Sequence, residues 1–140
     1  MSDQWVREFE HTGDLGLEVT APSRGELYRR AAIAMADAMV DTAGVIKQQS
    51  QEIQIAGTSD ADLMHDVLSK LLEIFIVDGF IWSEVAVVEE PEGLRLRAWG
   101  ETYDPSRHEF RTEIKAITYH ELEVTRQEDG VWSARIIFDI

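Results

Sequence analysis

Cysteine is absent from this sequence of 140 residues. The chain therefore has no disulfide framework, no thiolate metal ligand and no thiol nucleophile. Lysine is almost as scarce, and acidic side chains outnumber basic ones 27 to 13, for a formal net charge of -14. Because nucleic-acid binding draws much of its affinity from lysine and arginine, we expect no direct binding of RNA or DNA. The acidity favours cation binding or a basic partner protein, or it reflects solubility in a salty cytoplasm.

Long apolar runs are also missing. The longest apolar stretch, from Leu71 to Trp82, is interrupted by Glu73 and Asp78. It is too short to cross the ~30 Å hydrocarbon core of a bilayer. The first residues show neither the basic start nor the apolar stretch of a secretory signal. We therefore expect a cytoplasmic protein that does not bind membranes.

Prolines are few and scattered, and no repeat or low-complexity linker divides the chain. Apolar residues make up 44% of the sequence, which is enough for a hydrophobic core. One domain over residues 1–140 is the expected organisation.

The spacing of apolar residues predicts an α+β fold. A capping box at Ser23 begins a helix that runs to about Val40, and Ser59 begins a second helix that ends near Gly79. Alternation of apolar and polar residues predicts strands over residues 5–9, 15–19, 81–88, 94–100, 110–124 and 131–140, with a weaker strand around 45–55. We expect both helices to cover one face of a largely antiparallel sheet.

Two short stretches combine histidine with carboxylates or hydroxyls. One is His11-Thr12-Gly13-Asp14, in the loop between the first two predicted strands, and the other is Thr118-Tyr119-His120-Glu121, inside the predicted strand 110–124. Neither is a general catalytic motif. Taken alone, Asp14 is equally well explained as a turn residue, and Asp139 as a frayed chain end.

Together with the rest of the chain, these stretches resemble the archease family. The resemblance rests on four segments in the same order and at similar spacing: His11-Thr12-Gly13-Asp14-Leu15-Gly16, Gly100-Glu101 with Asp104 and His108, Lys115-Ala116-Ile117-Thr118-Tyr119-His120-Glu121-Leu122, and Phe138-Asp139-Ile140. One departure is Gly13, where the family more often has alanine. The four segments cover the chain from end to end.

The resemblance implies a metal-binding accessory protein and not an enzyme acting alone. In that family the early aspartate, the acidic residue before the C-terminus and the last residue bind a divalent cation, and the matching positions are Asp14, Asp139 and Ile140. Calcium is the expected ion, with magnesium or manganese as alternatives, because these ions take hard oxygen ligands. Further residues are expected near the metal or at a partner contact: His11, His108, Lys115 and His120.

The implied partner is an RtcB-type RNA ligase of tRNA splicing or RNA repair, whose guanylylation and multiple turnover such proteins promote. Two alternatives stay open. One is an independent metal-assisted hydrolase, in which Asp14, His11 and His120 surround a cation that activates water. The other is a general chaperone or modulator of RNA-modifying enzymes.

Overall fold

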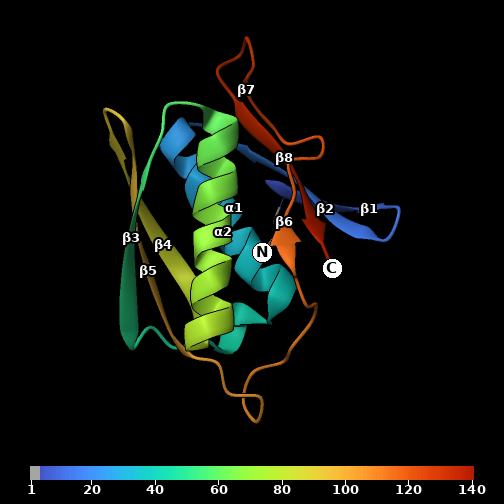
Figure 1. The fold of residues 1–140 in the computed structure, drawn as a ribbon, viewed down its shortest axis with the longest axis vertical. Coiled ribbons are helices and arrows are strands. Elements are labelled where there is room, and N and C mark those ends of the chain that lie inside the picture. The colour runs from blue at the N-terminus through green and yellow to red at the C-terminus, as the bar shows by residue number, and fades with distance from the viewer. Residues whose placement is uncertain (1–3) are drawn as a thin grey trace.

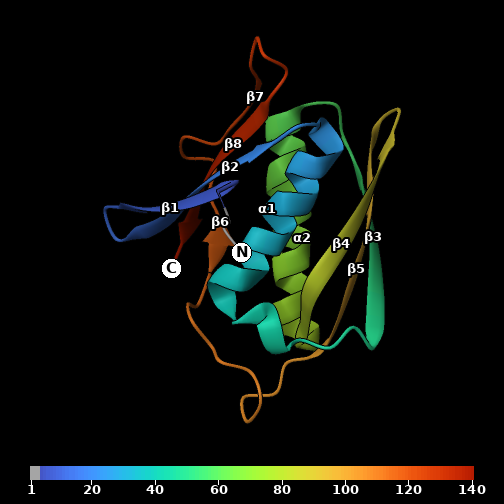
Figure 2. The same cartoon turned by 180° about the vertical axis from the view of Figure 1, so that it is seen from behind.

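Two antiparallel sheets lie on either side of a pair of helices (Figures 1 and 2). The computed structural model describes residues 4–140, and the side chain of His11 lies outside the described part. The first sheet contains β1 (Val6–His11), β2 (Asp14–Ala21), β8 (Trp132–Asp139) and β6 (Ala116–Ile117) in that order, with β7 (Glu123–Arg126) also paired with β8. The second contains β3 (Gln49–Ala56), β5 (Gly93–Thr102) and β4 (Phe80–Glu90) in that order. The helices are α1 (Arg24–Met39) and α2 (Asp60–Asp78), and a 3-10 helix, η1 (Thr42–Gly44), follows α1.

Both long helices begin and end where the capping residues predict. Ser23 accepts a hydrogen bond from the amide of Glu26 at 3.3 Å, and Ser59 accepts one from the amide of Asp62 at 3.4 Å. Gly79 follows α2 with a φ of +70°, a conformation that glycine adopts without strain. The two predicted helices are confirmed. Neither helix in the described part of the chain is long and apolar enough to cross a membrane.

The hydrophobic core lies around the helix layer, because the helices have a sheet on each side. Leu27 of α1 and Leu68 of α2 are fully buried. Trp82 of β4 is also fully buried, and it donates its indole N–H to the backbone carbonyl of Ala32 at 2.9 Å. The one polar atom of this large side chain is therefore satisfied inside the core.

The predicted α+β class, with two helices packed on antiparallel strands, is confirmed. The strands are divided between two sheets, so the helices lie between two layers of strands (Figure 1). Alternation along a strand shows which side chains face apolar neighbours. It does not show which strand pairs with which, and this is why the division into two sheets is not visible in the sequence.

The single strand predicted over residues 110–124 is wrong. Phe110 forms only an isolated bridge with Val40, and pairing resumes in the short strands β6 and β7. A turn at His120 and Glu121 separates these strands, and the φ of Glu121 is +51°, far from the extended values of a strand. The second histidine stretch therefore belongs to a connection.

A substitution at Gly100 tests the close approach of β4 and β5 in the second sheet. Gly100 is paired with Trp82 beside a bulge in β4, and a Cβ atom added there would overlap the carbonyl oxygen of Ile81. We expect Gly100→Ala to lower the free energy of unfolding by about 2–3 kcal/mol, because backbone must shift to admit the methyl group. Gly44→Ala is the matched control, since a Cβ there meets nothing within 4 Å. Urea unfolding measures both, and equal stability of the two variants would contradict the close approach.

Candidate functional site

Asp14 and Asp139 are neighbours at one end of the five-stranded sheet. β2 and β8 are paired up to Leu15 and Phe138, and the two aspartates are the next residues of these strands. Opposed residues on adjacent strands project from the same face of a sheet, so both carboxylates leave it on one side. Ile140 follows Asp139 as the last residue of the sequence. Figures 1 and 2 place this end of the chain on the same side of the molecule as the β1–β2 turn.

A two-residue turn positions Asp14. His11 and Asp14 are paired at the ends of β1 and β2, and between them Thr12 and Gly13 have φ values of +39° and +86°. Positive φ at both turn positions is the geometry of a tight hairpin whose twist matches its strands. Glycine adopts it without strain, so Gly13, the departure from the family pattern, suits this turn.

Lys115 lies beside the end of β8. Its amide donates a hydrogen bond to the carbonyl of Asp139 at 2.7 Å, and the next residue, Ala116, is paired with Asp139. Lys115 also borders a shallow hollow between α2 and β6, which is lined by the exposed side chains of Ile76 and Val77. A basic residue and an apolar surface therefore adjoin the acidic end of the sheet.

His120 lies at the surface, in the turn after β6. Thr118 holds this turn against β8, because both its amide and its hydroxyl donate to the carbonyl of Ile137, at 3.0 and 2.9 Å. The Nε2 atom of His120 is 3.1 Å from the carboxylate of Glu121, which also accepts a hydrogen bond from Arg135. The imidazole is exposed in this position, and its expected contact with a partner stays a prediction.

The structure does not bring His108 to the aspartates. Its side chain is buried in the loop after β5, and its Nδ1 atom accepts a hydrogen bond from the amide of Asp104 at 2.9 Å. Since Nδ1 is an acceptor, Nε2 carries the proton and donates to Glu101 at 3.0 Å. A buried imidazole with both nitrogens engaged cannot contact a partner surface, so the expected role of His108 is corrected to a structural one.

Glu101 is the centre of this buried cluster. The amide of Ile46, at 2.6 Å, lowers the pKa of Glu101 to about 2, and the Arg107 guanidinium and His108 act in the same direction against the effect of burial. The carboxylate joins three segments, because Ile46 precedes β3, Glu101 lies near the end of β5, and Arg107 and His108 belong to the following loop. Glu101 belongs to a segment that carries the family resemblance, but the sequence did not indicate its structural role.

The donor set at the aspartates suits a hard cation. Among residues 4–140, without the His11 side chain, no group of three or more histidine, aspartate or glutamate side chains is close enough together to hold a metal ion. Asp14 and Asp139 contribute two carboxylates at this end of the sheet, and Ile140, the last residue of the sequence, follows Asp139. Calcium and magnesium accept such ligands and complete their shells with water or carbonyl oxygens.

Comparison with known protein families gives one match over nearly the whole chain. The model described as "Archease protein family (MTH1598/TM1083)" matches residues 7–140. An archease of Pyrococcus furiosus is 33% identical to this chain over 98% of it and 99% of its own length. An archease of Methanopyrus kandleri is 39% identical over 95% of this chain and 97% of its own length.

Two solved structures share the fold. Protein 1598 of Methanobacterium thermoautotrophicum has a TM-score of 0.79 and 32% identity, and covers 97% of this chain and 99% of its own. An archease of Thermotoga maritima, described as a possible chaperone, has a TM-score of 0.66 and 23% identity over 96% of each chain. At that identity the second likeness concerns the fold alone.

The depressed pKa of Glu101 predicts a pH-dependent contribution to stability. A carboxylate whose pKa falls from 4.5 to about 2 on folding stabilises the folded state fully above pH 4.5 and loses that contribution as the pH falls toward 2. The stability difference between the wild type and Glu101→Gln should therefore grow from about pH 2 to 4.5 and stay constant above. Thermal unfolding of both proteins across this range measures it. A difference that does not change with pH would mean that Glu101 is not stabilised as the carboxylate.

Proposed function

Because the chain belongs to the archease family, we propose that it is a metal-binding accessory protein of an RtcB-type RNA ligase and has no catalytic site of its own. In this role it promotes guanylylation of the ligase and its repeated turnover in tRNA splicing or RNA repair. The observation that carries the proposal is the placement of Asp14, Asp139 and the chain end together, with Lys115 bonded to the same segment.

The proposed ion site uses Asp14, Asp139 and the terminal carboxylate of Ile140. Calcium is the first candidate, and magnesium and manganese are alternatives with the same preference for oxygen. A bound divalent cation supplies positive charge and open coordination positions to anionic groups of the partner. Lys115 and His120 lie on neighbouring segments, where their side chains contact the partner, and His11 is paired with Asp14 through the backbone.

The charge of the chain supports a protein partner with a basic surface. At a net charge of -14, this chain is attracted to the basic channel that binds nucleotide and RNA in a ligase, and repelled by the RNA itself. The exposed residues Ile76 and Val77 beside Lys115 give the contact an apolar component. A general chaperone would use similar features, and the Thermotoga maritima archease is described as a possible chaperone.

Ligase turnover separates these functions. Multiple-turnover joining of RNA ends by the cognate ligase, measured with and without this protein, should rise in its presence, and the effect should need the divalent ion. Unchanged turnover would contradict the proposal. A hydrolase would instead show activity of the purified protein on a model phosphoester, lost in Asp14→Ala.

The carboxylates are tested by Asp14→Asn and Asp139→Asn. Each change removes one anionic ligand while keeping its shape, and we expect calcium affinity to fall by about an order of magnitude or more, because ligand charge strongly tunes such sites. Isothermal titration calorimetry measures the affinity. Glu128→Gln is the charge-matched control, since this residue is exposed in the β7–β8 turn. Wild-type affinity in both aspartate variants would remove these residues from the site.

The terminal carboxylate is tested by extending the chain. Residues added after Ile140 replace an anionic terminus with a neutral carbonyl and crowd Asp139, so activation of the ligase should fall more than with the same tag placed before Met1. The two tagged proteins are compared across a calcium titration, after circular dichroism has confirmed equal folding. If both activate equally at limiting calcium, the terminal carboxylate is dispensable.

A further inference from the structure

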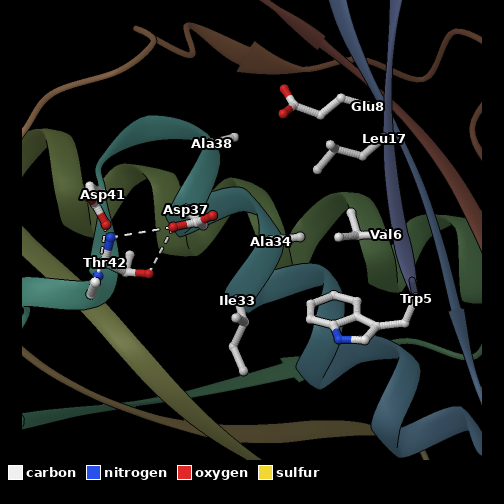
Figure 3. A pocket seen from close by; sticks show the side chains of 11 residues that line it. Trp5, Val6, Glu8, Leu17, Ile33, Ala34, Asp37, Ala38, Asp41 and Thr42 are labelled. Carbon is white, nitrogen blue, oxygen red and sulfur yellow. Dashed lines mark hydrogen bonds between the residues drawn. The ribbon is translucent and has the colours of Figure 1, made fainter. Parts of the chain in front are cut away.

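A second hollow lies between β1 and α1, and no feature of the proposed ion site involves it (Figure 3). Its volume is about 460 Å³, within the range of pockets that bind ligands. Its apolar walls are formed by seven residues: Trp5, Val6, Leu17, Ile33, Ala34, Ala38 and Ala43. Trp5 and Ile33 remain partly exposed, so the hollow leaves apolar surface in contact with water.

The same hollow carries carboxylates from two elements. Glu8 comes from β1, and Asp37 and Asp41 come from the end of α1 and the residue before η1. Figure 3 shows the three acidic side chains away from Trp5 and Ile33, with Asp37 and Asp41 on one side and Glu8 beside Leu17 on the other. The hollow therefore has an apolar part at Trp5 and Ile33 and a wider acidic part.

These acids are only partly neutralised. Arg111 lies 3.1 Å from a carboxylate oxygen of Asp37 and 3.7 Å from one of Asp41. The other oxygen of Asp37 accepts from the hydroxyl of Thr42 at 3.0 Å. Glu8 is exposed at the edge of the hollow. Asp37 and Asp41 share one guanidinium, and Glu8 adds a third negative charge to the lining of the hollow. The acidic part therefore stays negative and favours a positively charged group.

Arg30 does not supply that charge. Its guanidinium lies 5.4 Å from the centre of the Trp5 ring, but it already donates to Glu26 at 2.8 Å and to the carbonyl of Thr20 at 2.8 Å. It is therefore held at the start of α1, against the apolar part of the hollow. Arg111 is the cation that reaches Asp37 and Asp41, and a further positive charge for this part of the hollow comes from another molecule.

We infer that this hollow binds a segment of a partner protein in which an apolar side chain is followed by a lysine or arginine. The apolar side chain rests on Trp5 and Ile33, and the basic one extends to Glu8, Asp37 and Asp41. Burial of apolar surface supplies affinity, and the acids select for the basic neighbour. The inference rests on the proposed function only in taking the bound molecule to be a protein.

Nuclear magnetic resonance titration with a defined probe tests the inference. The probe is the capped peptide Gly-Leu-Lys-Gly, and its control is the capped peptide Gly-Leu-Glu-Gly. The lysine peptide should shift the indole N–H of Trp5 and the amides of residues 33–38, whereas the glutamate peptide should not. Absence of localised shifts, or equal shifts with both peptides, would overturn the inference. Equal shifts with spermidine, which lacks an apolar side chain, would also overturn it, because the acids alone would then account for binding.

Two variants change the two parts of the hollow separately. Ala34→Phe fills the apolar part, because Ala34 lines the hollow near Val6 (Figure 3), and Glu8→Lys reverses a charge at the acidic part. Each should weaken binding of the lysine peptide roughly tenfold. Glu128→Lys makes the same charge change at the β7–β8 turn and should leave binding unchanged. Circular dichroism confirms folding. Wild-type binding by both hollow variants would contradict the inference.

The outcome is independent of the ligase assay. Normal stimulation of the ligase together with failure of the peptide to bind would overturn the inference about the hollow and leave the proposed function standing. Peptide binding without stimulation would overturn the proposed function and leave the hollow as a protein-binding site.

Discussion

The antiparallel pairing of β2 with β8 is the contact on which the candidate site depends. It joins residues near the start of the sequence to its last strand, and seven residue pairs connect them from Ala21 to Leu15. On one face this pairing contributes Leu17 and Phe138 to the core, and at its end it sets Asp14 beside Asp139. Folding of the core and assembly of the site are therefore the same event.

The two sheets differ in the residues that they carry. The five-stranded sheet carries the acidic chain end, Lys115 and His120, whereas the three-stranded sheet covers the opposite side of the helices (Figure 2). The buried Glu101 cluster holds the long loop between the sheets, in which residues 103–115 contain no regular strand. A polar cluster suits this task, because an irregular segment lacks the ladder hydrogen bonds that hold a strand in place.

Local sequence signals predicted where helices begin and end better than they predicted which distant segments pair with one another. Ser23, Ser59 and Gly79 mark helix ends through their own hydrogen bonds or φ values, so the sequence locates them. The single strand predicted over residues 110–124 was wrong because Ile114 faces the core from an irregular segment held by hydrogen bonds to distant residues, and regular pairing begins only at β6, which contains Ile117. The resemblance to the family pointed to Asp14 and Asp139, but the register that makes them neighbours is a long-range property. The partner of Glu101, the amide of Ile46, is 55 residues away and has no side-chain signature at all.

Strand geometry also limits how this protein can change over evolution. Side chains alternate between the two faces of β8, so shifting it by one residue would turn Phe138 outward and Asp139 inward. A single inserted or deleted residue between Trp132 and Asp139 would therefore cost both a buried aromatic ring and a surface carboxylate. The β7–β8 turn at Glu128 and Asp129, which is exposed and outside this ladder, can change length without that penalty. Length variation among relatives should accumulate in such turns, and the last eight strand positions should keep their spacing.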